Sequence, residues 1–181
     1  MTMTILAYQD FLQAAARKLQ DPSLINRRSA LLIVNFERLA ELDGILGFAV
    51  VDNILTQVSN QLKTALNAED LVGTTGRYQV SCLLSDLLTD AHAMLAAHKI
   101  LRVLALPFVL DRRNIILAPR IGVALKTNAS TTLEQLMSNA SSAVRQARIA
   151  QETIKLFAVE TEDPLHLQID LWSDLGNAIE S

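Results

Sequence analysis

The residues whose types could do chemistry gather around one short stretch, residues 71–84, which reads LVGTTGRYQVSCLL. Apolar residues at both ends flank a small, turn-prone centre at Gly76-Arg77, a pattern typical of a buried β-hairpin. The tip offers the side chains of Arg77, Tyr78 and Gln79 and contains no carboxylate. Because phenol and amide groups carry no negative charge at neutral pH, this tip is a poor ligand set for Mg²⁺, which prefers carboxylate oxygens.

Other groupings of reactive side chains give weaker signals. Cys82 is the only cysteine, and its place in an apolar strand pattern favours a buried, inert thiol over a nucleophile. A single cysteine cannot form an internal disulfide, which favours a reducing, cytoplasmic location. His92, His98 and His166 have no carboxylate or cysteine at ligand spacing. We therefore expect no metal site and no bound cofactor.

Length and composition narrow the class of protein. A chain of 181 residues with 50% hydrophobic and 19% charged residues is expected to form one domain with a substantial core. The net charge of −3 and the absence of a dominant basic patch argue against nucleic-acid partners. The sequence has no signal-peptide pattern and no apolar run long enough to span a membrane.

Helical and strand patterns surround the hairpin. Apolar spacing predicts helices over residues 8–20, 36–43, 50–66 and 89–104, and a long last helix capped by Ser130 or Thr131. Strand patterns cover residues 29–35, 71–74, 79–84, 108–110, 114–117, 120–125 and 153–159. Gly44 and Gly47 are expected to bracket a turn, and Thr89 is expected to cap its helix. This order predicts an α/β sandwich, with a central, mostly antiparallel sheet flanked by helices.

The C-terminal part of the chain has a different character. A polar break at residues 161–164 is followed by an amphipathic pattern over residues 167–179, which contains the only tryptophan, Trp172. We therefore divide the chain into a domain over residues 1–159 and a linker with a C-terminal amphipathic helix over residues 160–181.

Four stretches carry a resemblance to GGDEF domains, the diguanylate cyclases: LLIVNFERLAELDGILGFAVVDNIL at residues 31–55, LVGTTGRYQVSCLLSDL at 71–87, PFVLDRRNIILAPRIGVAL at 107–125 and LEQLMSNASSAVRQARIAQETIKLF at 133–157. They resemble, in order, the first strand and its helices, the signature hairpin, a later hairpin with a core strand, and the final helix and strand. The resemblance rests on order, spacing and apolar pattern. It implies the GGDEF, or nucleotidyl-cyclase-like, fold.

The family joins two GTP molecules, held on two facing domains, with divalent cations stabilising the developing charge. The resemblance places Asn35 and Tyr78 at the two positions where the family carries metal carboxylates. The other signature positions are Gly76, Arg77, Gln79 and Val80, of which only Gly76 matches the family. Arg77 stands where a glycine lets the backbone approach phosphate, and it could pair with a phosphate or be a solvated turn residue. Catalytic and metal sites are therefore expected to be lost.

The resemblance leaves part of a nucleotide site. Asp52 matches a base-contacting Asp, Asp43 replaces an Asn, and Arg148 keeps the charge of a family lysine. With the turn at Gly76, these residues could bind GTP weakly. In the alternative, Asp43 and Asp52 are exposed acids near helix ends, and Asp52 lies where a helix start favours a carboxylate.

The inhibitory product site of the family is expected to be lost. Its R-x-x-D motif, which precedes the signature, is represented by Asn67 and Asp70. An Asn cannot supply the charge or the paired donors of an Arg.

Together these features predict a catalytically inactive GGDEF-like regulatory or interaction domain of bacterial cyclic di-GMP signalling, which gates or scaffolds a neighbouring domain or partner protein. Its tail resembles the helix that joins GGDEF domains to EAL phosphodiesterase domains, so a linked EAL domain is one expected partner. An uncovered tail helix would favour a homodimer. The alternatives are a GTP-binding sensor without turnover that regulates a linked EAL phosphodiesterase, and an active cyclase with an unusual metal site.

Overall fold

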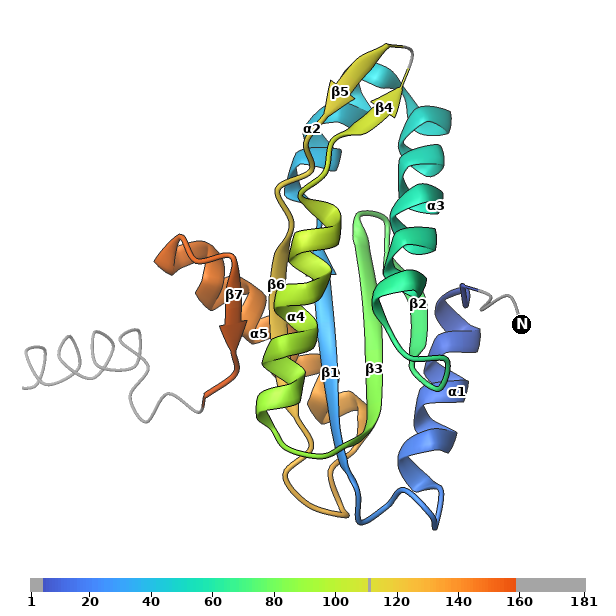
Figure 1. The fold of residues 1–181 in the computed structure, drawn as a ribbon, viewed down its shortest axis with the longest axis vertical. Helices are drawn as coiled ribbons and strands as arrows, with labels where there is room; N and C mark the ends of the chain where they lie inside the picture. The colour runs from blue at the N-terminus through green and yellow to red at the C-terminus, as the bar shows by residue number, and fades with distance from the viewer. Residues whose placement is uncertain (1–4, 111, 159–181) are drawn as a thin grey trace, which may run out of the picture.

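A five-stranded sheet in the order β2-β3-β1-β6-β7 forms the centre of the protein, and a second sheet pairs β4 with β5 (Figure 1). The structure is a computed structural model that describes residues 5–110 and 112–158. The strands are β1 (Arg28–Asn35), β2 (Leu71–Gly76), β3 (Gln79–Leu87), β4 (Phe108–Leu110), β5 (Arg113–Ile115), β6 (Arg120–Leu125) and β7 (Ile154–Leu156). The helices are α1 (Tyr8–Gln20), α2 (Glu37–Leu46), α3 (Phe48–Ala65), α4 (Ala91–Leu104) and α5 (Leu133–Ala150).

Strand β1 lies in the middle of the sheet. It pairs antiparallel with β3 and with β6, while β6 and β7 run parallel. Leu32 and Val34 belong to the core on the side of α3 and α4, whereas Leu31 and Ile33 belong to the core on the side of α1 and α5. Because both faces of β1 are covered, its sequence is a continuous apolar run. The predicted α/β architecture with a mostly antiparallel sheet is confirmed.

Helix α5 lies unusually close to β6. A Cβ atom at Gly122 would come within 2.2 Å of the Ala140 carbonyl oxygen and 2.8 Å of Val144 Cγ2. Gly73 makes the same allowance on β2, since a Cβ there would lie 2.6 Å from Phe11 Cβ. These two glycines let α5 pack directly on β6, and α1 on β2, the first strand of the hairpin.

The turns and caps differ from the sequence-based predictions in several places. Gly44 lies inside α2, and only Gly47, with a φ of 84°, breaks the chain between α2 and α3. The hairpin turn is one residue later than predicted, because β2 continues through Gly76 and Arg77-Tyr78 form the turn. The last helix is capped by Thr132, in a capping box with Gln135. The predicted caps at Ser130 and Thr131 are therefore wrong.

Helix α4 differs from the prediction at its start and at one side chain. It begins at Ala91, and the hydroxyl of Thr89 lies 2.7 Å from His92 Nδ1 instead of capping the helix. Apolar spacing predicts that Met94, Leu95 and Leu101 face inward. Met94 and Leu101 do pack against the core, whereas Leu95 is 62% exposed. The buried residues of this helix are Ala93, Ala97, Ile100 and Leu104. The amphipathic helix predicted over residues 167–179, and the whole segment 160–181, lie outside the described residues.

No helix within the described residues is both long enough and apolar enough to cross a membrane. Cys82 is fully buried in β3, and burial, which is the larger cause, together with the charge of Asp70 raises the pKa of its thiol to about 12. A thiol with so high a pKa stays protonated at neutral pH and is a poor nucleophile. The interpretation of Cys82 as a buried core residue is thus supported.

Candidate functional site

The hairpin tip lies beside the end of β1, as the strand register shows. Asn35 is directly opposite Gln79 of β3 on one side and Arg120 of β6 on the other. The amide of Phe36 donates a hydrogen bond to the Tyr78 carbonyl at 2.8 Å. The structure therefore brings Asn35 together with the turn residues, and it adds Arg120, which the sequence interpretation did not single out.

Arg77 and Tyr78 close over Asp43 of α2. Arg77 Nη2 and the Tyr78 hydroxyl each donate to Asp43 Oδ2 at 2.5 Å, and Arg77 Nε donates to the same oxygen at 2.9 Å. The Arg77 guanidinium also lies over the ring of Phe48, 4.2 Å from its centroid. The hydrogen bond from Tyr78, followed by that from Arg77, holds the pKa of Asp43 below its usual value.

These contacts decide between the alternatives left open for Asp43 and for Arg77. The Asp43 side chain is only 15% exposed, so it is not a free acid at a helix end. Arg77 is 47% exposed but is fixed by a carboxylate and an aromatic ring, so it is not a simple solvated turn residue. Arg77 and Asp43 are 34 positions apart in the sequence, so no local sequence pattern could have predicted that they pair.

Arg148, the candidate for phosphate contact, is held by Glu37 at the start of α2. Arg148 Nε donates to Glu37 Oε1 at 2.5 Å, and Arg120 Nε donates to Glu37 Oε2 at 3.4 Å. Burial acts to raise the pKa of Glu37, but the hydrogen bonds and charges of Arg148 and Arg120 outweigh it and lower the pKa. The sequence interpretation did not single out Glu37 or Arg120. Glu37 lies two residues after the predicted strand 29–35 and Arg120 begins the predicted strand 120–125, and charges at such strand ends are a usable signal of a site.

Asp52 stands apart from this cluster. It lies in the second turn of α3, which begins at Phe48, so the favourable helix start proposed for its carboxylate is wrong. Asp52 is exposed and lines a hollow of about 320 Å³ together with Thr56, Ser59 and Thr74. Within the described residues, no hydrogen bond or ion pair reaches its carboxylate or links it to Asp43.

Two signature positions have structural roles. Gly76 ends β2 opposite Gln79. The side-chain Nε2 of Gln79 donates a hydrogen bond to Thr75 Oγ1 at 3.0 Å. Val80 has no exposed surface and belongs to the core on the α3 and α4 side. The tip therefore joins the apolar core directly at Val80.

The residues that match the inhibitory motif are part of the scaffold. Asp70 is only 4% exposed, and its carboxylate accepts hydrogen bonds from the amides of Asn67 at 3.0 Å and Ser85 at 3.3 Å. Burial raises the pKa of Asp70 above its usual value. Its carboxylate ties the turn before β2 to β3, while Asn67 contributes a backbone amide to this contact.

A divalent cation does not fit the side chains at the tip. Asn35, Tyr78 and Gln79 offer neutral oxygens, and the nearby carboxylates of Asp43 and Glu37 are each neutralised by arginine. Across residues 5–110 and 112–158, no group of three or more His, Cys, Asp or Glu side chains could hold a metal ion.

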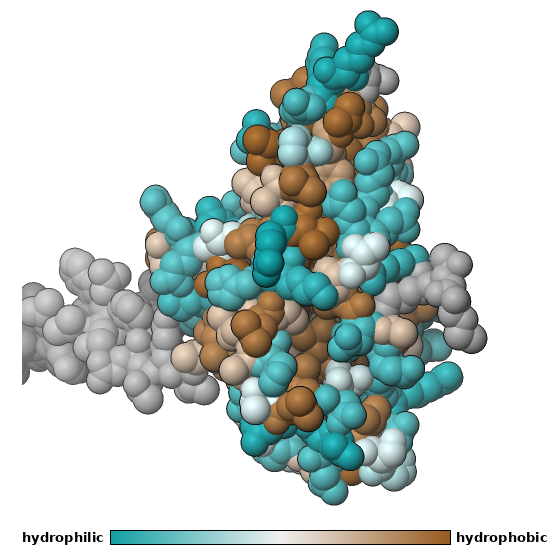
Figure 2. Space-filling view, in the orientation of Figure 1, coloured by the Kyte–Doolittle hydropathy of each residue, from teal (hydrophilic) through white to brown (hydrophobic). Residues whose placement is uncertain are grey.

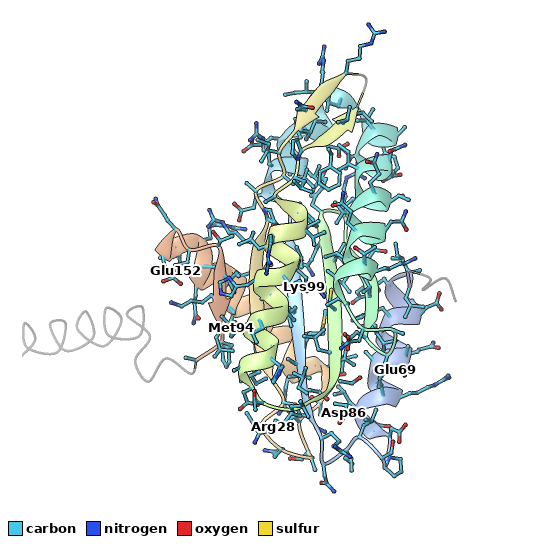
Figure 3. All side chains as sticks on the ribbon, in the orientation of Figure 1. Arg28, Glu69, Asp86, Met94, Lys99 and Glu152 are labelled. Carbon is cyan, nitrogen blue, oxygen red and sulfur yellow. The ribbon has the colours of Figure 1, made fainter. Side chains whose placement is uncertain are left out.

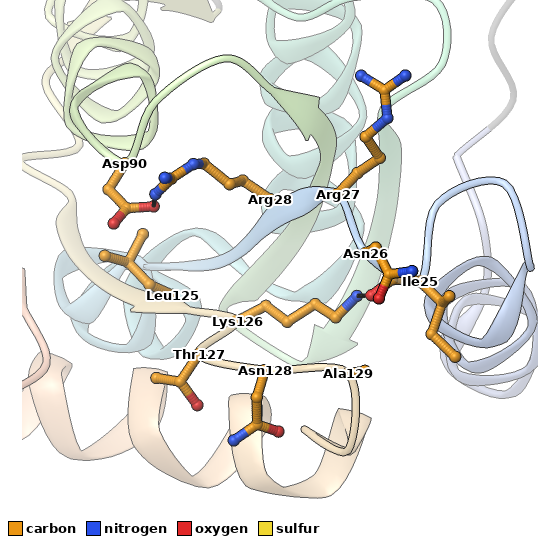
Figure 4. A pocket seen from close by; sticks show the side chains of 10 residues that line it. All are labelled: Ile25, Asn26, Arg27, Arg28, Asp90, Leu125, Lys126, Thr127, Asn128 and Ala129. Atoms are coloured by element: carbon orange, nitrogen blue, oxygen red, sulfur yellow. Dashed lines mark hydrogen bonds and ion pairs between the residues drawn. The ribbon is translucent and has the colours of Figure 1, made fainter.

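The opposite end of β1 contains a separate hollow of about 510 Å³, lined by Arg27, Arg28, Lys126 and Asp90 among others (Figure 4). Figure 3 shows Arg28 and Asp86 at this lower end of the sheet. Arg28 pairs with Asp90 at 3.0 Å, and Lys126 donates to the Ile25 carbonyl. Because these charges already have partners, the hollow is a weaker candidate than the hairpin tip.

Comparison with known proteins agrees with this geometry. The sequence model of the family "Diguanylate cyclase, GGDEF domain" matches residues 2–153. The chain is 28% identical over 158 residues to diguanylate cyclase TpbB of Pseudomonas aeruginosa, covering 84% of this chain and 35% of that protein. It is 24% identical over 138 residues to cyclic di-GMP phosphodiesterase NbdA of the same organism, covering 76% of this chain and 18% of that protein.

A solved structure shows the same architecture. The crystal structure of an EAL/GGDEF domain protein from M. capsulatus has 28% sequence identity and a TM-score of 0.72, and the match covers 81% of this chain and 93% of that one. The chain thus spans about a third or less of the length of the two curated relatives. Since the family match extends over most of the chain and the fold agrees, the chain belongs to the GGDEF domain family.

Proposed function

We propose that this GGDEF domain does not synthesise cyclic di-GMP and acts as a regulatory or interaction domain in cyclic di-GMP signalling. One observation carries the proposal: where β1 ends beside the hairpin tip, the side chains are Asn35, Tyr78 and Gln79. Joining two nucleotides through phosphate requires cations to offset the charge that develops. Two neutral amides and a phenol supply no anionic ligand for such cations.

The charges around the tip support the same proposal. Asp43 contacts the tip, and Glu37 pairs with Arg120, which lies opposite Asn35; each carboxylate has an arginine nitrogen at 2.5 Å. A divalent cation would have to displace a guanidinium from a charge-assisted hydrogen bond and would meet its repulsion. Arg148 is committed to Glu37, so phosphate support from the last helix is reduced as well.

A protein-binding role is favoured by the surface. Several large apolar side chains are strongly exposed in the segment 88–116, which contains α4 and the β4–β5 hairpin: Leu88, Leu95, Leu106, Val109 and Ile116. Figure 2 shows apolar atoms along the face that carries these elements. Exposed apolar surface of this kind favours contact with another domain or protein. A linked EAL domain is the partner we propose, with the related EAL/GGDEF protein as support, in a cytoplasmic protein that could also self-associate.

A GTP-binding sensor without turnover is the second candidate, because Asp52 leaves an exposed carboxylate on α3. Such a sensor would bind GTP weakly and pass the binding on to its partner. Binding without product formation separates this candidate from both an enzyme and a pure interaction domain.

The test is a cyclase assay on the purified chain with GTP and Mg²⁺ or Mn²⁺, with product measured by chromatography. We expect no cyclic di-GMP, and product formation by the wild-type chain would refute the proposal. A triple variant, Asn35→Asp, Arg77→Gly and Tyr78→Asp, should regain activity if the scaffold is otherwise competent. Asn128→Asp, which adds an acid away from the tip, is the matched control and should stay inactive.

A further inference from the structure

The Arg77 side chain is held more firmly than an ordinary residue of a hairpin turn. Ordering a long arginine side chain costs conformational entropy, and exposed ion pairs are usually weak. Here the guanidinium donates two hydrogen bonds to Asp43 Oδ2, donates a further one from Nε to the Tyr78 hydroxyl at 2.9 Å, and lies over the Phe48 ring. Three hydrogen bonds and one cation–π contact thus hold the planar guanidinium, as a binding site holds a ligand.

The two surfaces that hold this group are complementary to a class of small molecules. Asp43 is a largely buried acceptor that receives neighbouring N–H donors, and Phe48 is a flat ring that accepts a planar cation on its face. Planar groups with paired N–H donors, such as alkylguanidinium ions, have the shape and donors for both. The N–H edge of guanine has a similar donor arrangement, so a nucleotide approaching Asp43 would meet a position that is already filled.

The two groups that hold Arg77 belong to helices and not to the hairpin itself. Asp43 lies in the last turn of α2 and Phe48 begins α3, on either side of the break at Gly47. Removing the Arg77 side chain should therefore leave Asp43 and Phe48 in place.

We propose that Arg77 is an internal ligand of a site formed by Asp43 and Phe48, and that this site binds planar ligands with paired N–H donors once Arg77 is removed. The proposal deepens the proposed function, on which it rests for the view that this surface is not catalytic. It gives the lost signature glycine a specific consequence: the replacing arginine closes the site against external ligands.

The test is a titration of the Arg77→Ala variant of the full chain with ethylguanidinium. Binding is measured by NMR from the chemical shifts of the amides around Asp43 and Phe48. We expect saturable shifts at these residues in the variant. In the wild-type chain Arg77 competes for the site, and we expect an apparent affinity at least about tenfold weaker, which corresponds to an open site in about a tenth of the molecules. Arg77→Lys, which keeps the charge but lacks the planar fork, should bind ethylguanidinium more tightly than the wild-type chain does.

Arg27→Ala is the matched control. Arg27 also pairs with an acid, Asp86 at 3.2 Å, but within the described residues no aromatic ring accompanies that pair. We expect no saturable binding near Asp86 in that variant. Equal binding by wild type and Arg77→Ala, no binding by Arg77→Ala, or equal rescue of Arg27→Ala would overturn the proposal. Since ethylguanidinium has no phosphate, these outcomes do not depend on whether the domain makes cyclic di-GMP.

Discussion

The centre of the sheet and the tip of its hairpin are built on the same strands, yet their side chains serve different purposes. At the centre, Leu32 lies opposite Cys82 and Val123, and none of the three has exposed surface. At the tip, three residues further along β1, Asn35 lies opposite two polar residues. The comparison teaches that volume and apolarity maintain the fold at the centre, while the tip can exchange its chemistry without loss of the fold.

The largest effect should come from the centre. Leu32→Ala removes a fully buried side chain, and we expect it to lower the free energy of unfolding by about 4 kcal/mol in urea denaturation, since the cavity cannot fully collapse. Asn35→Ala on the same strand is the control and should cost under about 1 kcal/mol. Similar losses for both variants would show that the tip is as important to the fold as the centre.

A smaller loss is expected where α5 meets the sheet. Gly122→Ala would place a Cβ 2.2 Å from the Ala140 carbonyl oxygen, so helix or strand must shift, at a cost of about 2–3 kcal/mol. Gly44→Ala is the control, because nothing lies within 4 Å of its added Cβ and α2 should gain about 0.5–1 kcal/mol in helix propensity. Thermal and urea unfolding of both variants measure this difference. An unchanged stability of Gly122→Ala would contradict the close packing.

The smallest effects should separate two carboxylates by pH. The folded pKa of Asp43 is lowered, so its stabilising contribution is present above its usual pKa of 3.8 and is lost as the pH falls through the folded value. The folded pKa of Asp70 is raised, so its contribution is greatest at low pH and is lost as the pH rises through the folded value. Stability profiles between acid and neutral pH measure both.

Matched Asn substitutions isolate each contribution. Asp43→Asn should be less stable than the wild-type chain at neutral pH, and this difference in the free energy of unfolding should disappear as the pH falls below the usual Asp range. For Asp70→Asn, the free energy of unfolding should instead increase relative to that of the wild-type chain as the pH rises above that range. If both differences changed in the same direction with pH, the contrast between the paired tip carboxylate and the buried scaffold carboxylate would be wrong.

Much of the scaffold could be predicted from the sequence, because local patterns determine it. The strand predicted over residues 29–35 corresponds to β1, and the predicted first helix, residues 8–20, matches α1. In α4 the prediction failed at Leu95, which is exposed, because the smaller Ala93 and Ala97 fill the buried face. Small residues give a weak hydrophobic signal even where close packing depends on them.

The candidate site was predictable in its residue types but not in its contacts. The replacements at Asn35 and Tyr78 were visible in the sequence once the resemblance was noticed. The pairing of Arg148 with Glu37 joins residues 111 positions apart, and such contacts depend on how the helices pack on the sheet. The resemblance suggested free nucleotide-binding groups, whereas the fold pairs Asp43 and Arg148 within the chain.

The most direct test of the central claim is a calorimetric titration of the purified chain with a non-hydrolysable GTP analogue, with and without Mg²⁺. The central claim is that the hairpin tip has no chemistry for holding cations, so Mg²⁺ should make no difference to the heat of binding. We expect no Mg²⁺-dependent binding up to high micromolar ligand. Saturable binding that requires Mg²⁺ would contradict the account, because the tip would then hold the cation that its side chains are proposed to exclude.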